Sequence, residues 1–323
     1  MKKALPLFLI CILICCGAHA QRTEVYNPHI HTVQVIANND YMAPAAIRLG
    51  EGETVEISFD HLTHDYHRYQ YVLTHCNADW TPSDLSETEY LDGFNDNPIE
   101  DHDISVNTTL PYTHYRLTLP NDQVRPKLSG NYRLVVYDDA EGKNKPAFST
   151  CFRILEKEVN ISAQVSSDTE IDRNKTHQQV SFSIQHKGYP IRNPQNEIKV
   201  HVLQDNRTDN EVTNLQPSYV GPDQLRYEHN RALIFPAGNE YRRFEMVSTR
   251  YASQGVESIR YHAPYYHVTL QPDQPRLLNY SYDQDQNGRF VIRYDEAVDN
   301  NTEADYFFVH FSLLWENPLT EGK

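Results

Sequence analysis

The sequence predicts an all-β protein made of two consecutive β-sandwich domains of immunoglobulin-like type. Short runs of alternating apolar and polar residues recur along the chain, and turn-forming residues bound these runs. Apolar residues at helical spacing are almost absent. About seven such runs over roughly 130 residues are typical of an immunoglobulin-like sandwich.

The composition narrows the possible functions. The chain has 323 residues, a length that suggests two domains, and 39% of them are hydrophobic, enough for a core in each. Asp and Glu total 44 against 29 Lys and Arg, a formal charge of −15. Because a phosphate backbone needs clustered Lys and Arg, this balance argues against a nucleic-acid binder, and it argues equally against attraction to anionic lipid.

The N-terminus has the pattern of an export signal. Two lysines follow Met1, residues 4–16 form an apolar stretch too short to span a membrane, and Ala18-x-Ala20 has signal-peptidase spacing. We expect residues 1–20 to be a signal peptide. Its removal leaves 27 basic against 44 acidic residues, a mature charge of −17. Lipidation at Cys15 or Cys16 is the alternative, although Ile14 and Cys15 stand where a lipobox has a small residue.

The first domain is expected over residues 21–156. Its clearest strand is 54–59, where Val55, Ile57 and Phe59 share one face, and a second, 132–137, follows a Ser129-Gly130 turn signal. The other predicted strands of this domain are 32–36, 69–73, 115–119 and 148–155. Residues 78–109 are acidic and rich in turn formers, so we expect a long surface loop there.

A second series of alternating runs follows the charged residues 156–158. It predicts a second sandwich domain over residues 157–323, joined to the first without a low-complexity linker. The predicted strands are 159–165, 179–184, 197–203, 224–228, 242–247, 265–270, 276–282, 289–294 and 306–313.

Two cysteines remain in the mature chain, Cys76 and Cys151. In an oxidising compartment they could form one disulfide, and their spacing does not decide whether they do. Four histidines, His61, His64, His67 and His75, crowd one region. Their spacing does not suit one face of a strand, so we interpret them as solvated loop histidines and not as a metal site.

One segment matches the first half of a calcium loop. Asp283, Asp285 and Asn287 would offer oxygen ligands and Gly288 would allow the tight turn, but the twelfth position is Tyr294 where a Glu is needed. Asn287-Gly288 between alternating runs favours a hairpin turn, with calcium as the weaker alternative. We expect no cofactor.

Motifs of common enzymes are missing from the sequence. It contains no G-x-S-x-G elbow, no H-E-x-x-H, no phosphate-binding loop and no dinucleotide fingerprint. His75 and Cys76 are adjacent, and neighbouring residues on a strand point to opposite faces, so they do not form a base and nucleophile pair. Carboxylates are plentiful, so counting does not exclude a glycosidase pair, but nothing singles out two of them. We expect a protein that is not an enzyme and has no small-molecule substrate.

Five short phrases together resemble one known family. They are His75-Cys76-Asn77-Ala78-Asp79-Trp80, Ser129-Gly130-Asn131-Tyr132, Gln204-Asp205-Asn206-Arg207, Gly238-Asn239-Glu240-Tyr241-Arg242-Arg243-Phe244 and Ala304-Asp305-Tyr306-Phe307-Phe308-Val309-His310-Phe311. In this order they are similar to the plug proteins of the type 9 secretion system, over about residues 32–313.

The resemblance implies a non-catalytic periplasmic protein, peripheral to the outer membrane. Its partner would be the very large outer-membrane β-barrel of the translocon, whose periplasmic mouth it would seal. Members of the family usually continue into a third, small β domain, which we expect this chain to lack because it stops at Lys323.

Three aromatic residues of the 78–109 segment, Trp80, Tyr90 and Phe94, are candidates for partner binding, because large aromatic residues often anchor interfaces. The alternative is that Trp80 is part of the core and that the loop covers a sheet edge. The competing function is an exported glycan-binding or glycan-processing accessory, since β-sandwiches rich in Tyr and Trp bind sugars by ring stacking. The chain has only two tryptophans, Trp80 and Trp315.

Overall fold

The computed structural model describes residues 22–314, apart from residue 239 and residues 274–284. The expected signal peptide, the predicted strand 276–282, Asp283 and Trp315 lie outside these residues. Strands make up 41% of the structure and helices 5%, in several antiparallel sheets, so the predicted all-β sandwich class is confirmed. Within the described residues, no helix is long and apolar enough to cross a bilayer.

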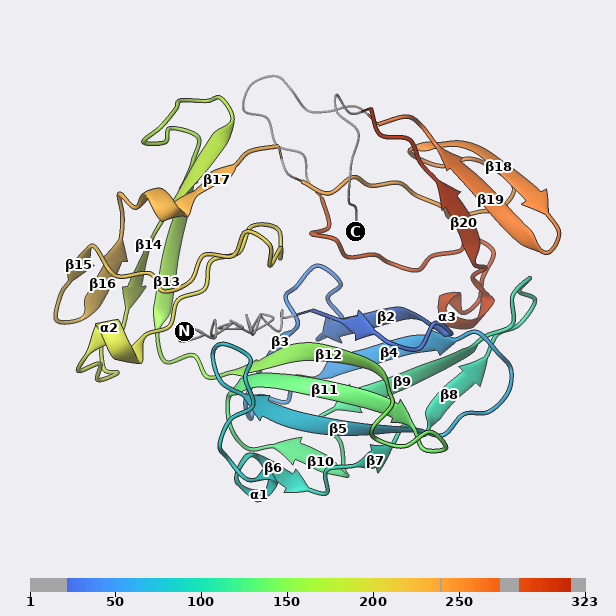
Figure 1. The fold of residues 1–323 in the computed structure, drawn as a ribbon, viewed down its shortest axis with the longest axis horizontal. Helices are drawn as coiled ribbons and strands as arrows, with labels where there is room; N and C mark the ends of the chain where they lie inside the picture. The colour runs from blue at the N-terminus through green and yellow to red at the C-terminus, as the bar shows by residue number, and fades with distance from the viewer. Residues whose placement is uncertain (1–21, 239, 274–284, 315–323) are drawn as a thin grey trace, which may run out of the picture.

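The N-terminal part is a sandwich of two sheets (Figure 1). The strands of the first sheet are β1 (Glu24–Val25), β3 (Ala46–Arg48), β5 (Tyr69–Cys76), β7 (Asn97–Pro98), β11 (Gly130–Asp138) and β12 (Pro146–Leu155). Their order is β1-β12-β11-β5-β7, and β3 pairs in parallel with β12. The second sheet has the order β2-β4-β9-β8 and contains β2 (Ile30–Ala37), β4 (Val55–His61), β9 (Thr113–Leu119) and β8 (Asp101–Ile104).

The core lies between these two sheets and follows the predicted alternation. Val55, Ile57 and Phe59 of β4 are completely buried. The Phe59 ring stacks on Tyr115 of the neighbouring strand at 5.1 Å and meets Phe148 of the opposite sheet at 4.9 Å. Phe59 therefore joins the two layers, and burial of such aromatic surface is the main source of stability in a sandwich.

Residues 78–109 differ from the predicted surface loop. They contain α1 (Glu87–Tyr90), β6 (Leu91–Gly93), β7 and β8, and β6 pairs with β10 (Val124–Pro126). These elements are two to four residues long, and their pairing partners lie elsewhere in the chain. Local sequence patterns could not reveal them, because the stabilising pairs are formed across strands.

The C-terminal half contains two smaller sheets. One is formed by β13 (Asn160–Ser166), β14 (His177–Gln185), β15 (Tyr219–Val220), β16 (Gln224–Tyr227) and β17 (Ile234–Pro236). The other is formed by β18 (Val256–His262), β19 (Tyr265–Leu270) and β20 (Phe307–His310). The helices of this half are α2 (Pro194–Glu197), the 3-10 turn η1 (Arg231–Leu233) and α3 (Asn300–Glu303).

Three predicted strands of this half have no ladder. Residues 242–247 and 289–294 are not assigned as strands, and residues 197–203 retain only a bridge between Val202 and Val212. Residues 242–247 and 289–294 instead line a cavity, described below. An alternating pattern marks an extended chain with one covered face, and a cavity wall can satisfy it as a sheet does.

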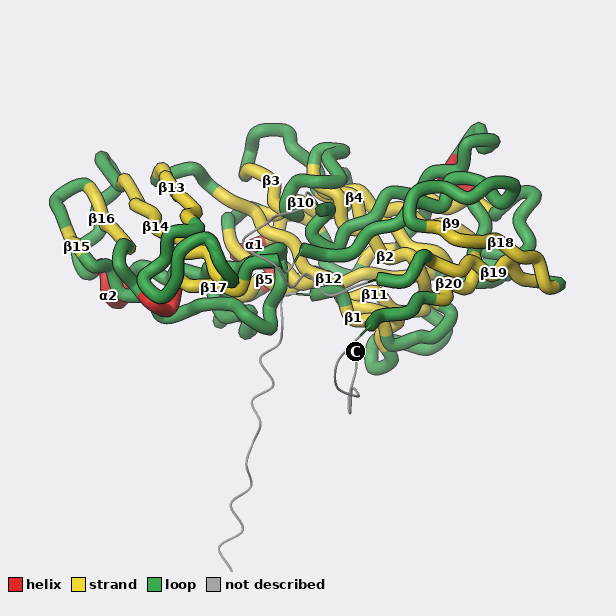
Figure 2. Tube along the Cα trace, turned by 90° about the horizontal axis from the view of Figure 1, so that it is seen from above, coloured by secondary structure: helices red, strands yellow, loops and turns green. Residues whose placement is uncertain are grey.

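The three parts have a simple arrangement. Both smaller sheets lie over the same side of the sandwich, with β13–β17 towards one end and β18–β20 towards the other (Figure 1 and Figure 2). The short elements α1, β6, β7 and β10 lie on the side of the sandwich that faces away from both smaller sheets (Figure 1).

Candidate functional site

Trp80, the first of the three aromatic candidates, is 8% exposed. It lies in a tight turn with a φ of 65°, in which its N–H donates to the carbonyl of Asn77 at 3.0 Å. The Arg153 guanidinium lies 5.4 Å from the centre of its ring. The indole therefore packs on the sandwich, and little of it is accessible to a partner.

Tyr90, at the end of α1, is 5% exposed. Its hydroxyl donates to the carbonyl of Leu73 at 3.2 Å, and burial raises the pKa of this hydroxyl above its ordinary value. The ring is therefore packed inside the sandwich, and the hydroxyl is hydrogen-bonded there.

Phe94, between β6 and β7, is 84% exposed. It follows Gly93, whose φ is 100°, and a Cβ at Gly93 would meet the Gln123 carbonyl oxygen at 2.0 Å. The Phe94 N–H donates to this same carbonyl at 3.3 Å, and the Phe94 carbonyl accepts from the Asn97 side chain at 2.5 Å. The backbone is held on both sides of the ring, while the ring itself points into solvent.

Asn95 anchors the loop to the sandwich. Its side-chain oxygen accepts from the Leu73 N–H at 2.8 Å, and its amide nitrogen donates to the Leu73 carbonyl at 2.9 Å and to Glu87 at 2.9 Å. The Asn95 side chain thus forms the two hydrogen bonds that a neighbouring strand would otherwise form with Leu73 of β5. The next residue, Asp96, forms an ion pair with Lys143 at 2.7 Å and accepts from the Tyr137 hydroxyl. We call residues 93–97 the Phe94 loop.

Of the predicted calcium pattern, Asp285, Asn287 and Gly288 lie among the described residues. Asp285 accepts from the N–H groups of Tyr241 at 2.7 Å and Asn287 at 3.2 Å. Asn287 and Gly288 form a turn with positive φ angles. Among the described residues, no group of three or more His, Cys, Asp or Glu side chains is placed to hold a metal.

The histidines predicted as solvated loop residues are not all solvated, which corrects that interpretation. His61 belongs to β4 and is 5% exposed, with the Tyr69 hydroxyl 3.1 Å from its Nδ1. Burial and the nearby His67 and His29 lower the pKa of His61 to about 4. The predicted strand ends at residue 59, whereas β4 continues to His61, so the sequence pattern placed His61 in a loop.

The two cysteines are free thiols. Cys76 lies opposite Asn131 and Cys151 opposite Arg133, so β11 separates the two strands that carry them. Burial raises the pKa of Cys76 above its ordinary value and that of Cys151 to about 12, so both thiols stay protonated at neutral pH.

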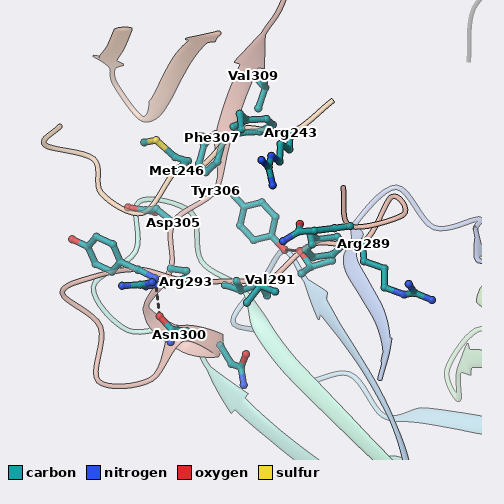
Figure 3. Close-up of a pocket in the computed structure, with 18 of the residues that line it drawn as sticks. Arg243, Met246, Arg289, Val291, Arg293, Asn300, Asp305, Tyr306, Phe307 and Val309 are labelled. Carbon is teal, nitrogen blue, oxygen red and sulfur yellow. Dashed lines mark hydrogen bonds between the residues drawn. The ribbon is translucent and has the colours of Figure 1, made fainter. Parts of the chain in front are cut away.

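A cavity of 590 Å³ lies where the C-terminal half meets the second sheet of the sandwich. Figure 3 shows Tyr306 near its centre, beneath Arg243. Most of the accessible wall is apolar, with side chains such as Met246, Val291 and Phe307.

At the base of this cavity Tyr306 is bonded to the sandwich. Its hydroxyl donates to Asp60 Oδ2 at 2.6 Å, and Asp60 Oδ1 lies 2.6 Å from His114 Nδ1. Burial and the Asp60 carboxylate hold the pKa of Tyr306 well above its ordinary value, so Tyr306 remains a donor. The neighbouring Asp305 accepts from the N–H of Thr109 at 2.6 Å and from its hydroxyl at 2.7 Å.

Two further contacts complete this connection. The Tyr112 hydroxyl donates to the Ala304 carbonyl at 2.9 Å, and the Val106 N–H donates to the Thr302 carbonyl at 2.8 Å. We call the contacts of residues 302–306 with the sandwich the clasp. Asp305 and Tyr306 belong to a family phrase, but sequence reasoning gave them no role because their partners are distant along the chain.

Part of the chain matches a known protein family. Residues 30–156 match the family model of the type 9 secretion system plug protein, first domain. The chain belongs to the type 9 secretion system plug family. The match ends just after β12, the last strand of the sandwich.

The plug-family chain is also similar to a solved structure. A crystal structure of a hypothetical protein from Parabacteroides merdae is 49% identical in sequence with a TM-score of 0.88, over 93% of this chain and 75% of that one. An alkylpurine DNA glycosylase from Pseudomonas fluorescens reaches a TM-score of only 0.22, which carries no structural argument. No curated protein matches.

Proposed function

We propose that this chain is a non-catalytic plug that closes the periplasmic mouth of the type 9 translocon barrel. The match of residues 30–156 to the plug family carries the proposal. The expected export signal supports a periplasmic location, peripheral to the outer membrane.

The physical properties of the sandwich suit a steric seal. A seal must keep its shape against the pore, and close-packed interiors resist deformation. Phe59, Tyr69, Tyr115 and Phe148 form a completely buried aromatic cluster that spans the two sheets. The clasp adds the C-terminal sheet to this body through partly buried hydrogen bonds.

The proposal is tested in cells that lack the gene. We expect their outer membrane to admit a large hydrophilic antibiotic, and a plasmid copy of the gene to restore the barrier. The tagged protein should fractionate with the periplasm and co-purify with the translocon barrel from detergent-solubilised outer membrane. An intact barrier in the deletion strain, together with recovery free of the barrel, would overturn the proposal.

A further inference from the structure

We propose that Phe94 is an anchor residue that inserts into an apolar socket on the surface of the partner protein. The inference rests on the proposed function, because it names the part of the plug that touches its translocon partner. It goes further by committing to one side chain, one loop and the chemistry of the opposing surface.

The Phe94 ring is unusually exposed. Phe94 is the most exposed large hydrophobic residue among the described residues of the sandwich, at 84%. The same segment buries Trp80 and Tyr90 almost completely, so the fold has the means to cover an aromatic ring there. Full burial of such a ring is worth roughly 1.5–3 kcal/mol, which the free chain forgoes and a complex would recover.

Hydrogen bonds to the sandwich hold the Phe94 loop in place. The Gln123 carbonyl accepts from the Phe94 N–H and the Asn97 side chain donates to the Phe94 carbonyl, while Asn95 binds both backbone groups of Leu73 in the first sheet. A loop that is already held in one conformation loses little entropy when its side chain docks. Buried anchors that meet a preformed pocket are the residues that dominate binding energy.

Acidic residues surround the Phe94 ring. Asp92 and Asp96 flank Phe94 in sequence, Glu87 is bonded to the loop through Asn95, and Asp122 precedes the Gln123 that accepts from Phe94. Two cations, Lys143 and Arg125, pair with Asp96 and Asp122. The remaining negative charge is complementary to a basic rim around the socket, and it opposes insertion of the ring into an anionic lipid surface.

The Phe94 loop lies where a partner can reach it. The elements that carry the Phe94 loop, β6 and β7, lie on the side of the sandwich away from both C-terminal sheets (Figure 1). A partner can therefore reach Phe94 without displacing either sheet.

The experiment measures binding of the mature chain to the purified translocon barrel of its own organism in detergent. We expect Phe94→Ala to weaken binding by at least about 30-fold, the effect of removing a hot-spot residue. Phe94→Trp should keep binding within about 10-fold of the unchanged chain, because an aromatic anchor is retained. The control is Tyr66→Ala in the β4–β5 loop, where Tyr66 is 62% exposed, and it should change affinity by less than about 3-fold.

The outcomes separate the two proposals. If the unchanged chain does not bind the barrel, the proposed function fails and the anchor fails with it. If the unchanged chain binds and Phe94→Ala binds within about 3-fold of it, only the anchor is overturned. Loss of barrel binding that is equal for Phe94→Ala and Tyr66→Ala also overturns it. Phe94-dependent binding to vesicles of anionic phospholipid, with barrel binding unchanged, would assign the ring to a membrane and reject a protein socket.

Discussion

The sandwich and the C-terminal half are stabilised in different ways. Among the described residues, eleven of the twelve largest fully buried side chains belong to the sandwich, and the twelfth, Tyr227, belongs to the C-terminal half. The last sheet, β18–β20, is instead connected to the sandwich by the polar contacts of the clasp. The sandwich therefore has the larger apolar core, the β13–β17 sheet has a smaller one of its own, and the β18–β20 sheet is linked to the sandwich by directional hydrogen bonds.

The largest expected loss of stability follows substitution of Phe59, which joins the two sheets of the sandwich. Phe59→Ala should destabilise the chain by about 3–5 kcal/mol, because it leaves a cavity among three aromatic rings. Urea unfolding followed by tyrosine fluorescence measures the loss. Phe290→Ala in the C-terminal half, where Phe290 is 44% exposed, is the control and should cost less than about 1 kcal/mol. Equal losses would abolish the distinction between the halves.

The pH dependence of stability should come from the sandwich. His61 has a pKa of about 4 when folded, against about 6.5 when unfolded, so the unfolded chain binds the extra proton between these values. The stability is complete above about pH 6.5 and falls as the pH is lowered to about 4, by up to roughly 3 kcal/mol.

Thermal unfolding between pH 4 and 7 checks this dependence. His61→Gln should flatten the curve, whereas His64→Gln, at an exposed position, should leave it unchanged. An unaltered slope in His61→Gln would show that other groups carry the dependence.

The clasp gives the next effect. Tyr306→Phe removes the hydroxyl that donates to buried Asp60, and this should cost about 1–3 kcal/mol. Because the lost bond joins the halves, limited proteolysis should cut the C-terminal half earlier while the sandwich persists. Tyr261→Phe, at a 53% exposed position on β18, is the matched control. Simultaneous loss of both halves in Tyr306→Phe would mean that the clasp does not separate them.

The smallest effect is within the sandwich, at the Phe94 loop. Asn95→Ala removes the side chain that bonds both backbone groups of Leu73, at a cost of about 1–2 kcal/mol, measured by urea unfolding. Asn95→Asp keeps the acceptor for the Leu73 N–H but turns a carboxylate oxygen towards the Leu73 carbonyl and Glu87, so it should lose at least as much. Phe94→Ala should change stability by less than about 0.5 kcal/mol, because the ring is in solvent. A larger loss in Phe94→Ala would mean that the ring supports the fold.

The sequence predicted the parts of the fold that depend on local alternation. Val55, Ile57 and Phe59, like Tyr132, Leu134 and Val136, form buried faces as expected, because a period of two assigns residues to a face without knowledge of the partner strand. The segments 242–247 and 289–294 carry the same pattern without a ladder, because the pattern does not identify what covers the face.

The candidate site was less accessible to sequence reasoning. Phe94 was among the partner candidates, but its difference from Trp80 and Tyr90 depends on burial, which a single sequence does not supply. The Asn95 amide beside Leu73 and the Tyr306 hydroxyl on Asp60 join residues far apart in the chain. Such pairs leave no periodic signal.

The clasp also determines how mechanical load travels through the molecule. Asp305 is bonded to Thr109 across 196 positions of the chain, so the segment between them forms a loop closed by hydrogen bonds. A force applied to the β18–β20 sheet passes directly into the sandwich near β9 and bypasses the β13–β17 sheet. The segment between Thr109 and Asp305 can therefore be extended by such a force only after the clasp breaks, and its unfolding would then lengthen the molecule.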